Sequence, residues 1–211
     1  MRVTKIKRKP NAFSLIELLV TITIIALLAA ILLPAFGSAK KKANSVSCQN
    51  NVRQLSVITF LYCQDNNDYL PFAWYNDSSP SENNFCSLLT PLLYRSEFDG
   101  YSDFETKVFT CPQRMKEPLV GPNPMRISYG MNANNSIDFP DPRTRRLNSV
   151  ARPAGTLLIA DIAFSYNHPP IQSLGPDQVG YKHDARANYV FFDGHAAAES
   201  LQQTNALVVK F

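Results

Sequence analysis

The stretch "RKPNAFSLIELLVTITIIALLAAILLPAF", residues 8–36, determines how this chain is built. From Phe13 to Phe36 the only ionisable side chain is Glu17. As a helix rising about 1.5 Å per residue, this segment is roughly 36 Å long, which exceeds a bilayer core of about 30 Å. The segment therefore predicts a membrane-spanning helix with one carboxylate near its start, and that carboxylate requires an explanation.

Positive charge is concentrated in front of the apolar segment. The 211 residues include 21 Lys+Arg and 17 Asp+Glu, for a formal net charge of +4. Five of the basic residues lie in residues 1–12, which contain no acidic residue. The positive-inside rule places residues 1–12 in the cytoplasm and the body of the chain on the other side of the membrane. Because the body itself is close to neutral, we expect no nucleic-acid partner.

Two ordinary interpretations of the apolar segment leave Glu17 unexplained. A secretory signal peptide cleaved after the small residues 37–39 would have a shorter apolar core, of about 7–15 residues. A plain single-span anchor has no use for a carboxylate that costs on the order of 2.5–3.5 kcal/mol on insertion scales. The position of Glu17 near the cytoplasmic edge lowers this cost without giving the residue a role.

The sequence "AFSLIELLV", residues 12–20, resembles the prepilin processing site of type IV pilins and type II secretion pseudopilins. The resemblance implies that a prepilin peptidase cuts between Ala12 and Phe13 and methylates the new amino group. Glu17 then becomes the fifth residue of the mature chain, and Pro34 takes a position where many members also have proline. Ala12 departs from the usual glycine. In the family's filaments Glu17 would face the Phe13 amine of a neighbouring subunit, which gives the carboxylate its partner.

The helix is expected to run from 14 to 62, with an apolar stripe along its second half. The stripe consists of Val46, Val52, Leu55, Ile58, Thr59 and Tyr62. Pro34 and Gly37 are expected to kink or loosen the helix. The chain thus divides into a leader (1–12), a transmembrane assembly segment (13–36), an amphipathic half-helix (37–64) and an extracytoplasmic body (65–211).

The body is expected to supply an antiparallel sheet that covers the amphipathic half-helix, which gives an α+β fold. The resemblance implies that this fold is pilin-like. The strand candidates are 107–111, 126–131, 156–164, 187–192, 195–200 and 206–211. Asp193-Gly194 predicts a two-residue type I′ turn between the fourth and fifth candidates. Residues 74–106 are typical of an irregular, partly helical insertion.

Four cysteines, none in a C-x-x-C pair, allow three full disulfide connectivities. Cys48 and Cys63 lie fifteen residues apart on one predicted helix, about 22 Å, which is beyond disulfide reach. Of the two remaining connectivities, we favour Cys48–Cys111 with Cys63–Cys86. The alternative is that one or more of these cysteines are buried and reduced.

The segment "HDARANYVFFDGHA", residues 183–196, carries a second resemblance, to pseudopilin-like proteins with a His–nine residues–Asp-Gly signature that are abundant in planctomycetes. A functional interpretation is a metal or catalytic site formed by His183, Asp193 and His195. A structural interpretation makes Asp193-Gly194 a turn and lets His183 bond a nearby loop backbone. We favour the structural interpretation.

These observations predict a non-enzymatic pseudopilin-like subunit of the bacterial inner membrane, with the body in the periplasm, that assembles into a type II secretion pseudopilus or a type IV pilus-like filament. Its expected partners are the prepilin peptidase/N-methyltransferase, copies of itself and other pseudopilins. No catalytic residue and no cofactor is expected; the oxygen-rich residues 64–68, with Asp138 and Asp141, leave a structural calcium ion as a minor alternative. The rival functions are a membrane-anchored periplasmic binding protein that does not polymerise, and a metal-dependent enzyme.

Overall fold

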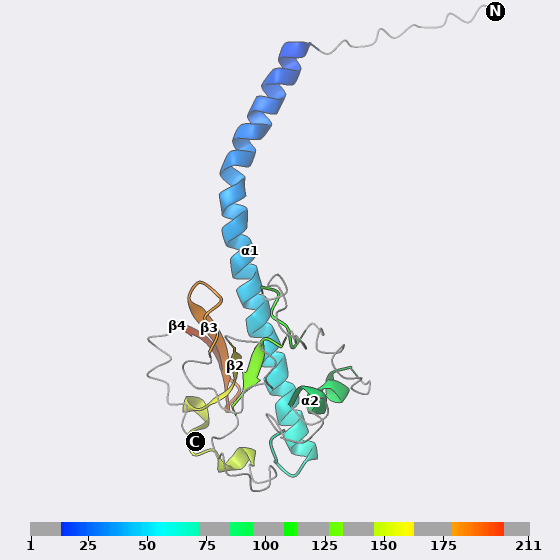
Figure 1. Ribbon diagram of the computed structural model, residues 1–211, viewed down its shortest axis with the longest axis vertical. Helices are drawn as coiled ribbons and strands as arrows, with labels where there is room; N and C mark the ends of the chain where they lie inside the picture. Colours follow the sequence, from blue (N-terminus) through cyan, green and yellow to red (C-terminus); the bar gives the residue numbers. More distant parts are fainter. Residues whose placement is uncertain are drawn as a thin grey trace, which may run out of the picture. The chain divides into compact units, whose positions relative to one another are not determined.

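The computed structural model describes residues 14–71, 85–94, 108–113, 127–132, 146–162 and 179–200. The chain divides into two compact units, residues 1–40 and 41–211, and each is considered by itself. Helix α1 (Leu15–Asp65) contributes to both units, and the second unit contains the remaining elements. These are helix α2 (Phe85–Tyr94), strands β1 (Tyr129–Met131), β2 (Leu157–Asp161), β3 (Arg186–Phe191) and β4 (Ala196–Ser200), and the 3₁₀ turns Leu147–Ser149 and Pro153–Gly155 (Figure 1).

Glu17, the carboxylate in the apolar segment, caps the first turn of α1. The Ser14 backbone N–H donates to Glu17 Oε2 at 2.9 Å, and Leu18 N–H donates to the Ser14 carbonyl at 3.2 Å. This is one half of a capping box, in which a glutamate three residues after the cap satisfies a backbone donor that the helix leaves free. Thr21 and Thr23 donate their hydroxyls to helix carbonyls, so these polar groups are also satisfied within the helix.

The apolar half of α1 has no cover within its own unit. Large side chains from Leu15 to Phe36 are between half and four-fifths exposed, and α1 continues through Pro34 without interruption. Among the described residues, α1 is the one helix long and apolar enough to cross a membrane. These properties suit a membrane anchor, because lipid or other apolar helices must replace water around such a surface.

The second half of α1 is amphipathic, as predicted, but its buried face differs in detail from the expected stripe. Val52, Leu55 and Thr59 are buried, whereas Val46 is exposed. The full buried face comprises Cys48, Asn51, Val52, Leu55, Ser56, Thr59 and Cys63. Its spacing of three and four residues matches one side of a helix, and its two cysteines extend the stripe at both ends.

The four strands form one antiparallel sheet in the order β1-β2-β3-β4. Along β3, Asn188 and Val190 alternate with Tyr189 and Phe191, and alternate residues belong to opposite faces. Val190 joins the larger core, together with the buried side chains of α1 and α2. Tyr189 and Phe191 join a second, smaller core with Leu157. Strands β2 and β3 are therefore buried on both faces, whereas β4 is only partly buried, and the fold is α+β as predicted.

Two tight turns flank β3, and the type I′ geometry belongs to the one that was not predicted. Asp184 and Ala185 both have positive φ, at 52° and 60°, between reciprocal backbone hydrogen bonds that join His183 and Arg186. That pattern is a two-residue type I′ turn. Between β3 and β4 only Gly194 has positive φ, at 87°. The predicted hairpin is confirmed, but the turn type is wrong.

The β3–β4 loop instead contains three residues. Gly194 N–H donates to the Phe191 carbonyl at 2.9 Å, and Phe191 N–H donates to the His195 carbonyl at 3.0 Å. This arrangement, with a left-handed glycine after the turn, is that of a type I turn followed by a bulge. A side chain at position 194 would also meet Phe60 of α1, because an added Cβ lies 3.4 Å from the Phe60 ring.

Two further predictions about the body have different outcomes. Residues 108–111 form turns and bends, so the strand predicted over 107–111 is wrong for these residues; Phe109 and Cys111 are buried there and linked to Ser128 instead. Helix α2 confirms the partly helical character of the insertion over 74–106. The strand predicted over 206–211 lies outside the described residues.

We predict that Gly194→Ala lowers the free energy of unfolding by about 1–2 kcal/mol, because alanine is strained at positive φ and its Cβ is tight against Phe60. Gly155→Ala is the matched control: its Cβ meets nothing within 4 Å, and its effect should stay within about 0.5 kcal/mol. Urea unfolding of the detergent-solubilised chain measures both. Equal effects of the two substitutions would contradict the assigned turn.

Candidate functional site

The N-terminal processing site can be described only in part. Ala12 and Phe13 lie outside the described residues, so their predicted roles stay predictions. Glu17 is described and exposed at the start of α1, where its carboxylate accepts the Ser14 N–H. The sequence signal for this contact is the Ser-x-x-Glu spacing of Ser14 and Glu17, which the initial interpretation did not use.

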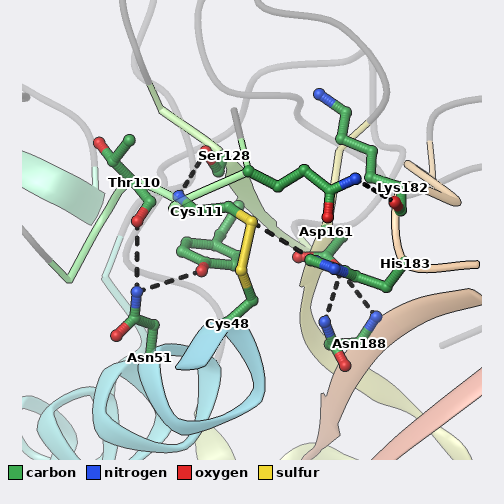
Figure 2. The surroundings of a disulfide bond; sticks show 11 residues. Cys48, Asn51, Thr110, Cys111, Ser128, Asp161, Lys182, His183 and Asn188 are labelled. Carbon is green, nitrogen blue, oxygen red and sulfur yellow. Dashed lines mark hydrogen bonds and ion pairs between the residues drawn. A yellow bond between two sulfur atoms is a disulfide. The ribbon is translucent and has the colours of Figure 1, made fainter. Parts of the chain in front are cut away.

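The second site is a buried cluster around a disulfide between Cys48 on α1 and Cys111 in the segment 108–113 (Figure 2). The two Cα atoms are 5.3 Å apart, within the usual range for a disulfide. The predicted Cys48–Cys111 pairing is thus confirmed. Cys63 and Cys86 are both free and buried, so the predicted second disulfide is wrong.

The free thiols sit in the larger apolar core. Burial raises the pKa of the Cys63 thiol to about 11, with a further contribution from the charge of Asp68, and burial raises the pKa of Cys86 well above its usual value. Both cysteines therefore remain protonated near neutral pH and are poor nucleophiles. They act as small apolar side chains in the core.

Polar groups fix the backbone around the disulfide. Cys111 N–H donates to Ser128 Oγ at 2.8 Å, and Ser128 N–H donates to the Phe109 carbonyl at 2.9 Å. From α1, the Asn51 amide donates at 3.3 Å both to the Thr110 carbonyl and to the Tyr129 hydroxyl. The disulfide and these bonds hold the segment 108–113 between α1 and β1.

His183 completes the cluster from the turn before β3. Its Nε2 lies 3.4 Å from Cys111 Sγ and 3.7 Å from Asp161 Oδ2, and its side chain is almost fully buried (Figure 2). The type I′ turn after His183 fixes its backbone by pairing with Arg186. The structural interpretation of His183 is therefore modified: its ring contacts a sulfur and a carboxylate rather than a loop carbonyl.

Asp161, at the end of β2, is the buried carboxylate that the sequence interpretation missed. Its Oδ2 accepts the backbone N–H of Asn188 at 2.8 Å and the Asn188 amide at 2.9 Å. Within the described part of the chain, its Oδ1 and the Nδ1 of His183 have no hydrogen-bond partner. The sequence of residues 157–162, "LLIADI", gave no signal of this contact, because an aspartate at this place is also what the exposed end of a strand would carry.

Burial opposes charge on both members of the pair. Burial raises the pKa of Asp161 to about 7, although hydrogen bonds from Asn188 and the charge of Lys182 act in the other direction. Burial also lowers the pKa of His183, with a smaller lowering from the Lys182 charge and an opposing effect of Asp184. Below neutral pH the carboxyl is therefore mostly protonated, and the contact is a buried polar pair rather than a full ion pair.

The remaining residues of the His–Asp-Gly signature lie at the opposite end of β3. Asp193 Oδ1 accepts the His195 N–H at 3.0 Å and contacts His195 Nδ1 at 2.6 Å in an exposed loop. His183 precedes the strand and belongs to the buried cluster. The three side chains do not converge, so the alternative metal site at His183, Asp193 and His195 is wrong. Asp193-Gly194 form part of the loop, as the structural interpretation predicted.

The described residues place metal-ligating atoms together elsewhere. The two sulfurs of Cys48 and Cys111 and a ring nitrogen of His183 all lie within 4.8 Å of one another. Residues 64–68, considered above for calcium, end α1: Asp68 N–H donates to the Cys63 carbonyl at 2.7 Å, and Asn67 and Asp68 have positive φ. Asp138 and Asp141 lie outside the described residues.

Two comparisons relate the chain to known proteins. The family model described as the prokaryotic N-terminal methylation motif matches residues 7–33. The type IV wide pilus major component PilA4 of Thermus thermophilus is 40% identical over 62 residues, which is 29% of this chain and 47% of that protein. The chain thus spans about half the length of this curated relative. No solved structure matches the chain. Both matches agree with the resemblance read from residues 12–20.

We predict that proteolysis without reduction yields a linked Cys48–Cys111 peptide, while Cys63 and Cys86 become alkylated only after unfolding. Reduction should lower the free energy of unfolding by about 4 kcal/mol, because the cross-link spans 63 residues. A Cys63→Ala/Cys86→Ala chain should lose the same amount on reduction. A linked Cys63–Cys86 peptide would contradict the assignment.

Asp161→Asn tests the buried carboxyl. The folded pKa of about 7 exceeds the usual 3.8, so the folded chain retains a proton that the unfolded chain releases between these values. Wild-type stability relative to Asp161→Asn should therefore fall by up to about 4 kcal/mol as pH rises from about 4 to 7. The lowered pKa of His183 makes the folded chain less stable as pH falls below 6.5, which is the opposite trend. Because wild type and Asp161→Asn both contain His183, this contribution largely cancels when their free energies of unfolding are subtracted.

The exposed carboxyl of Asp193 supplies the control for this pH series. Burial opposes its charge, but the hydrogen bonds and charge of His195 together hold its net pKa below the usual value. Relative to Asp193→Asn, wild-type stability should thus be constant above pH 4 and decrease only in more acidic solution. A difference between wild type and Asp161→Asn that is constant between pH 4 and 7 would contradict the assigned burial.

Proposed function

We propose that this type IV prepilin-like chain is a structural subunit that is cut between Ala12 and Phe13, methylated on Phe13 and assembled into a pseudopilus or pilus-like filament. The observation that carries the proposal is a methylation-motif match over residues 7–33, where the large apolar side chains of α1 from Leu15 to Leu33 are exposed. The expected processing enzyme is a prepilin peptidase/N-methyltransferase. The expected assembly partners are copies of this chain and related subunits.

The exposed apolar half of α1 supports assembly through helix bundling. Side chains such as Leu15, Ile25 and Leu33 are at least 65% exposed, and each gains about 1.5–3 kcal/mol on full burial. Lipid provides that burial before assembly, and neighbouring helices provide it in a filament. The polar threonines of this segment bond back to their own helix, so they do not oppose either environment.

Glu17 gives the bundle its register. In the uncut chain the carboxylate accepts only the Ser14 N–H in the described region, which leaves its charge without a cation. Cleavage before Phe13 creates an amino group one residue away from Ser14. In a bundle, that amine on one subunit and Glu17 on its neighbour form a charge-assisted bond in an apolar setting. The carboxylate thereby favours one axial offset between helices.

The body is proposed to lie in the periplasm, because residues 1–12 carry the positive charge that is retained in the cytoplasm. A disulfide in the body suits an oxidising compartment. The cross-link ties the second half of α1 to the segment 108–113, so a force applied along α1 reaches this segment through a covalent bond and passes to Ser128, next to β1, through hydrogen bonds. This supports a mechanical role, whether the filament serves secretion or a pilus.

Substitution of the assembly glutamate tests this function. We predict that Glu17→Gln reduces the amount of subunit in sheared filaments at least about tenfold, because a charge-assisted bond is worth about 1.5–3 kcal/mol per contact. Membrane insertion and cleavage before Phe13 should be unaffected. Glu199→Gln, the same chemical change in β4, should assemble normally.

If Glu17→Gln and wild type give the same filament yield, the helix does not use its carboxylate for assembly. Complete absence of filaments in the wild type, with all the chain retained as monomer in the inner membrane, would instead support a membrane-anchored binding protein that does not polymerise.

A further inference from the structure

We propose that Cys48, Cys111 and His183 bind a thiophilic metal ion such as Zn²⁺ whenever the two cysteines carry thiols rather than a disulfide. In the described part of the chain, these three residues form the group whose ligand atoms converge within 4.8 Å. Two thiolates and an imidazole are the ligands that zinc prefers in closed structural sites.

The separations fit a tetrahedral site after a small movement. Zinc–sulfur bonds of about 2.3 Å and zinc–nitrogen bonds of about 2.0–2.1 Å place the ligand atoms roughly 3.5–3.8 Å apart. Cys111 Sγ and His183 Nε2 are already 3.4 Å apart. The two sulfurs must separate, from a covalent bond to a non-bonded distance, and the ring nitrogen of His183 already lies within 4.8 Å of both. The Cα atoms of the two cysteines, 5.3 Å apart, allow that separation by side-chain rotation.

The three ligands come from separate elements whose backbones are fixed independently of the disulfide. Cys48 belongs to α1, and Cys111 is held by the bond from its N–H to Ser128 Oγ. His183 is held by the backbone pairing with Arg186 on the other side of the type I′ turn. Because these contacts persist when the sulfur–sulfur bond is absent, the dithiol form retains a preorganised ligand set.

Asp161 lies next to His183 but outside the three converging ligand atoms, so its carboxylate takes the remaining position only after a side-chain movement. Its Oδ2 lies 3.7 Å from His183 Nε2, a separation expected of two ligands of one ion, and its buried Oδ1 has no partner in the described region. A carboxylate oxygen is an accepted zinc ligand. The nearby charge of Lys182, which acts on both Asp161 and His183, offsets part of the negative charge of two thiolates and a carboxylate.

Metal binding and disulfide formation exclude each other. Disulfide formation removes two electrons and two protons from the two thiols and transfers the electrons to an oxidant such as another protein's disulfide. Metal binding releases the two thiol protons and transfers no electrons. In both states α1 remains tied to the segment 108–113, through sulfur–sulfur in one and sulfur–metal–sulfur in the other. A newly made chain that captures metal is thereby protected from oxidation at this site.

The test uses the full chain in detergent, reduced with a phosphine, freed of metal and titrated with Zn²⁺ and, separately, with Co²⁺ as a spectroscopic probe. We expect one Zn²⁺ per chain and a thiolate-to-cobalt charge-transfer band. Zinc should also slow alkylation of Cys48 and Cys111. The oxidised chain is folded, has the same sequence and should bind no zinc at this site.

Variants locate the ion. Cys48→Ser/Cys111→Ser should bind zinc at least about 100-fold more weakly than the wild type. Cys63→Ser/Cys86→Ser is the matched control, because it also removes two thiols, and it should bind zinc like the wild type. His183→Gln should bind about 10–100-fold more weakly while keeping the cobalt–thiolate band with altered intensity. Equal zinc binding by oxidised and reduced wild type, or loss of binding in Cys63→Ser/Cys86→Ser, would overturn the proposal.

Discussion

The body depends on burying one face of the second half of α1 against the sheet. Val52, Leu55 and Thr59 are removed from water there, together with the inner face of β3. The same face carries Cys48 and Asn51, which attach the segment 108–113 to α1 through the cross-link to Cys111 and a hydrogen bond to the Thr110 carbonyl. The polar cluster of His183, Asp161 and Asn188 lies beside the cross-link, where each polar group must find a partner inside the protein.

The apolar side chains of the two halves of α1 are kept from water in different ways. One face of residues 41–65 is buried in the chain's own core, whereas the side chains from Leu15 to Phe36 stay exposed and require lipid or other helices. Glu17 is compatible with an apolar surrounding of lipid or other helices because the Ser14 N–H donates to it and, in the proposed filament, an amine of a neighbouring subunit pairs with it. One continuous helix therefore joins an assembly segment to a folded body.

Periodicity in the sequence was sufficient for features that depend on local pattern. It predicted the long helix, the amphipathic face of its second half and the pairing of the strands around Asp193-Gly194. It failed where the outcome depends on contacts between distant segments. Asp161 and Asn188 are 27 residues apart, and no spacing rule joins them. The predicted Cys63–Cys86 disulfide was wrong because the sequence does not report the distance between two buried thiols.

The most direct test of the account is the N-terminus of the membrane-derived chain, determined by intact mass and N-terminal peptide mass spectrometry with the processing peptidase present and absent. The account predicts a chain that begins at methylated Phe13 when the peptidase is present and at Met1 when it is absent. A chain that keeps Met1 in both cases would contradict it and leave a plain membrane anchor. A chain that begins near Lys40 would contradict it differently, because the apolar segment would then be a discarded signal peptide.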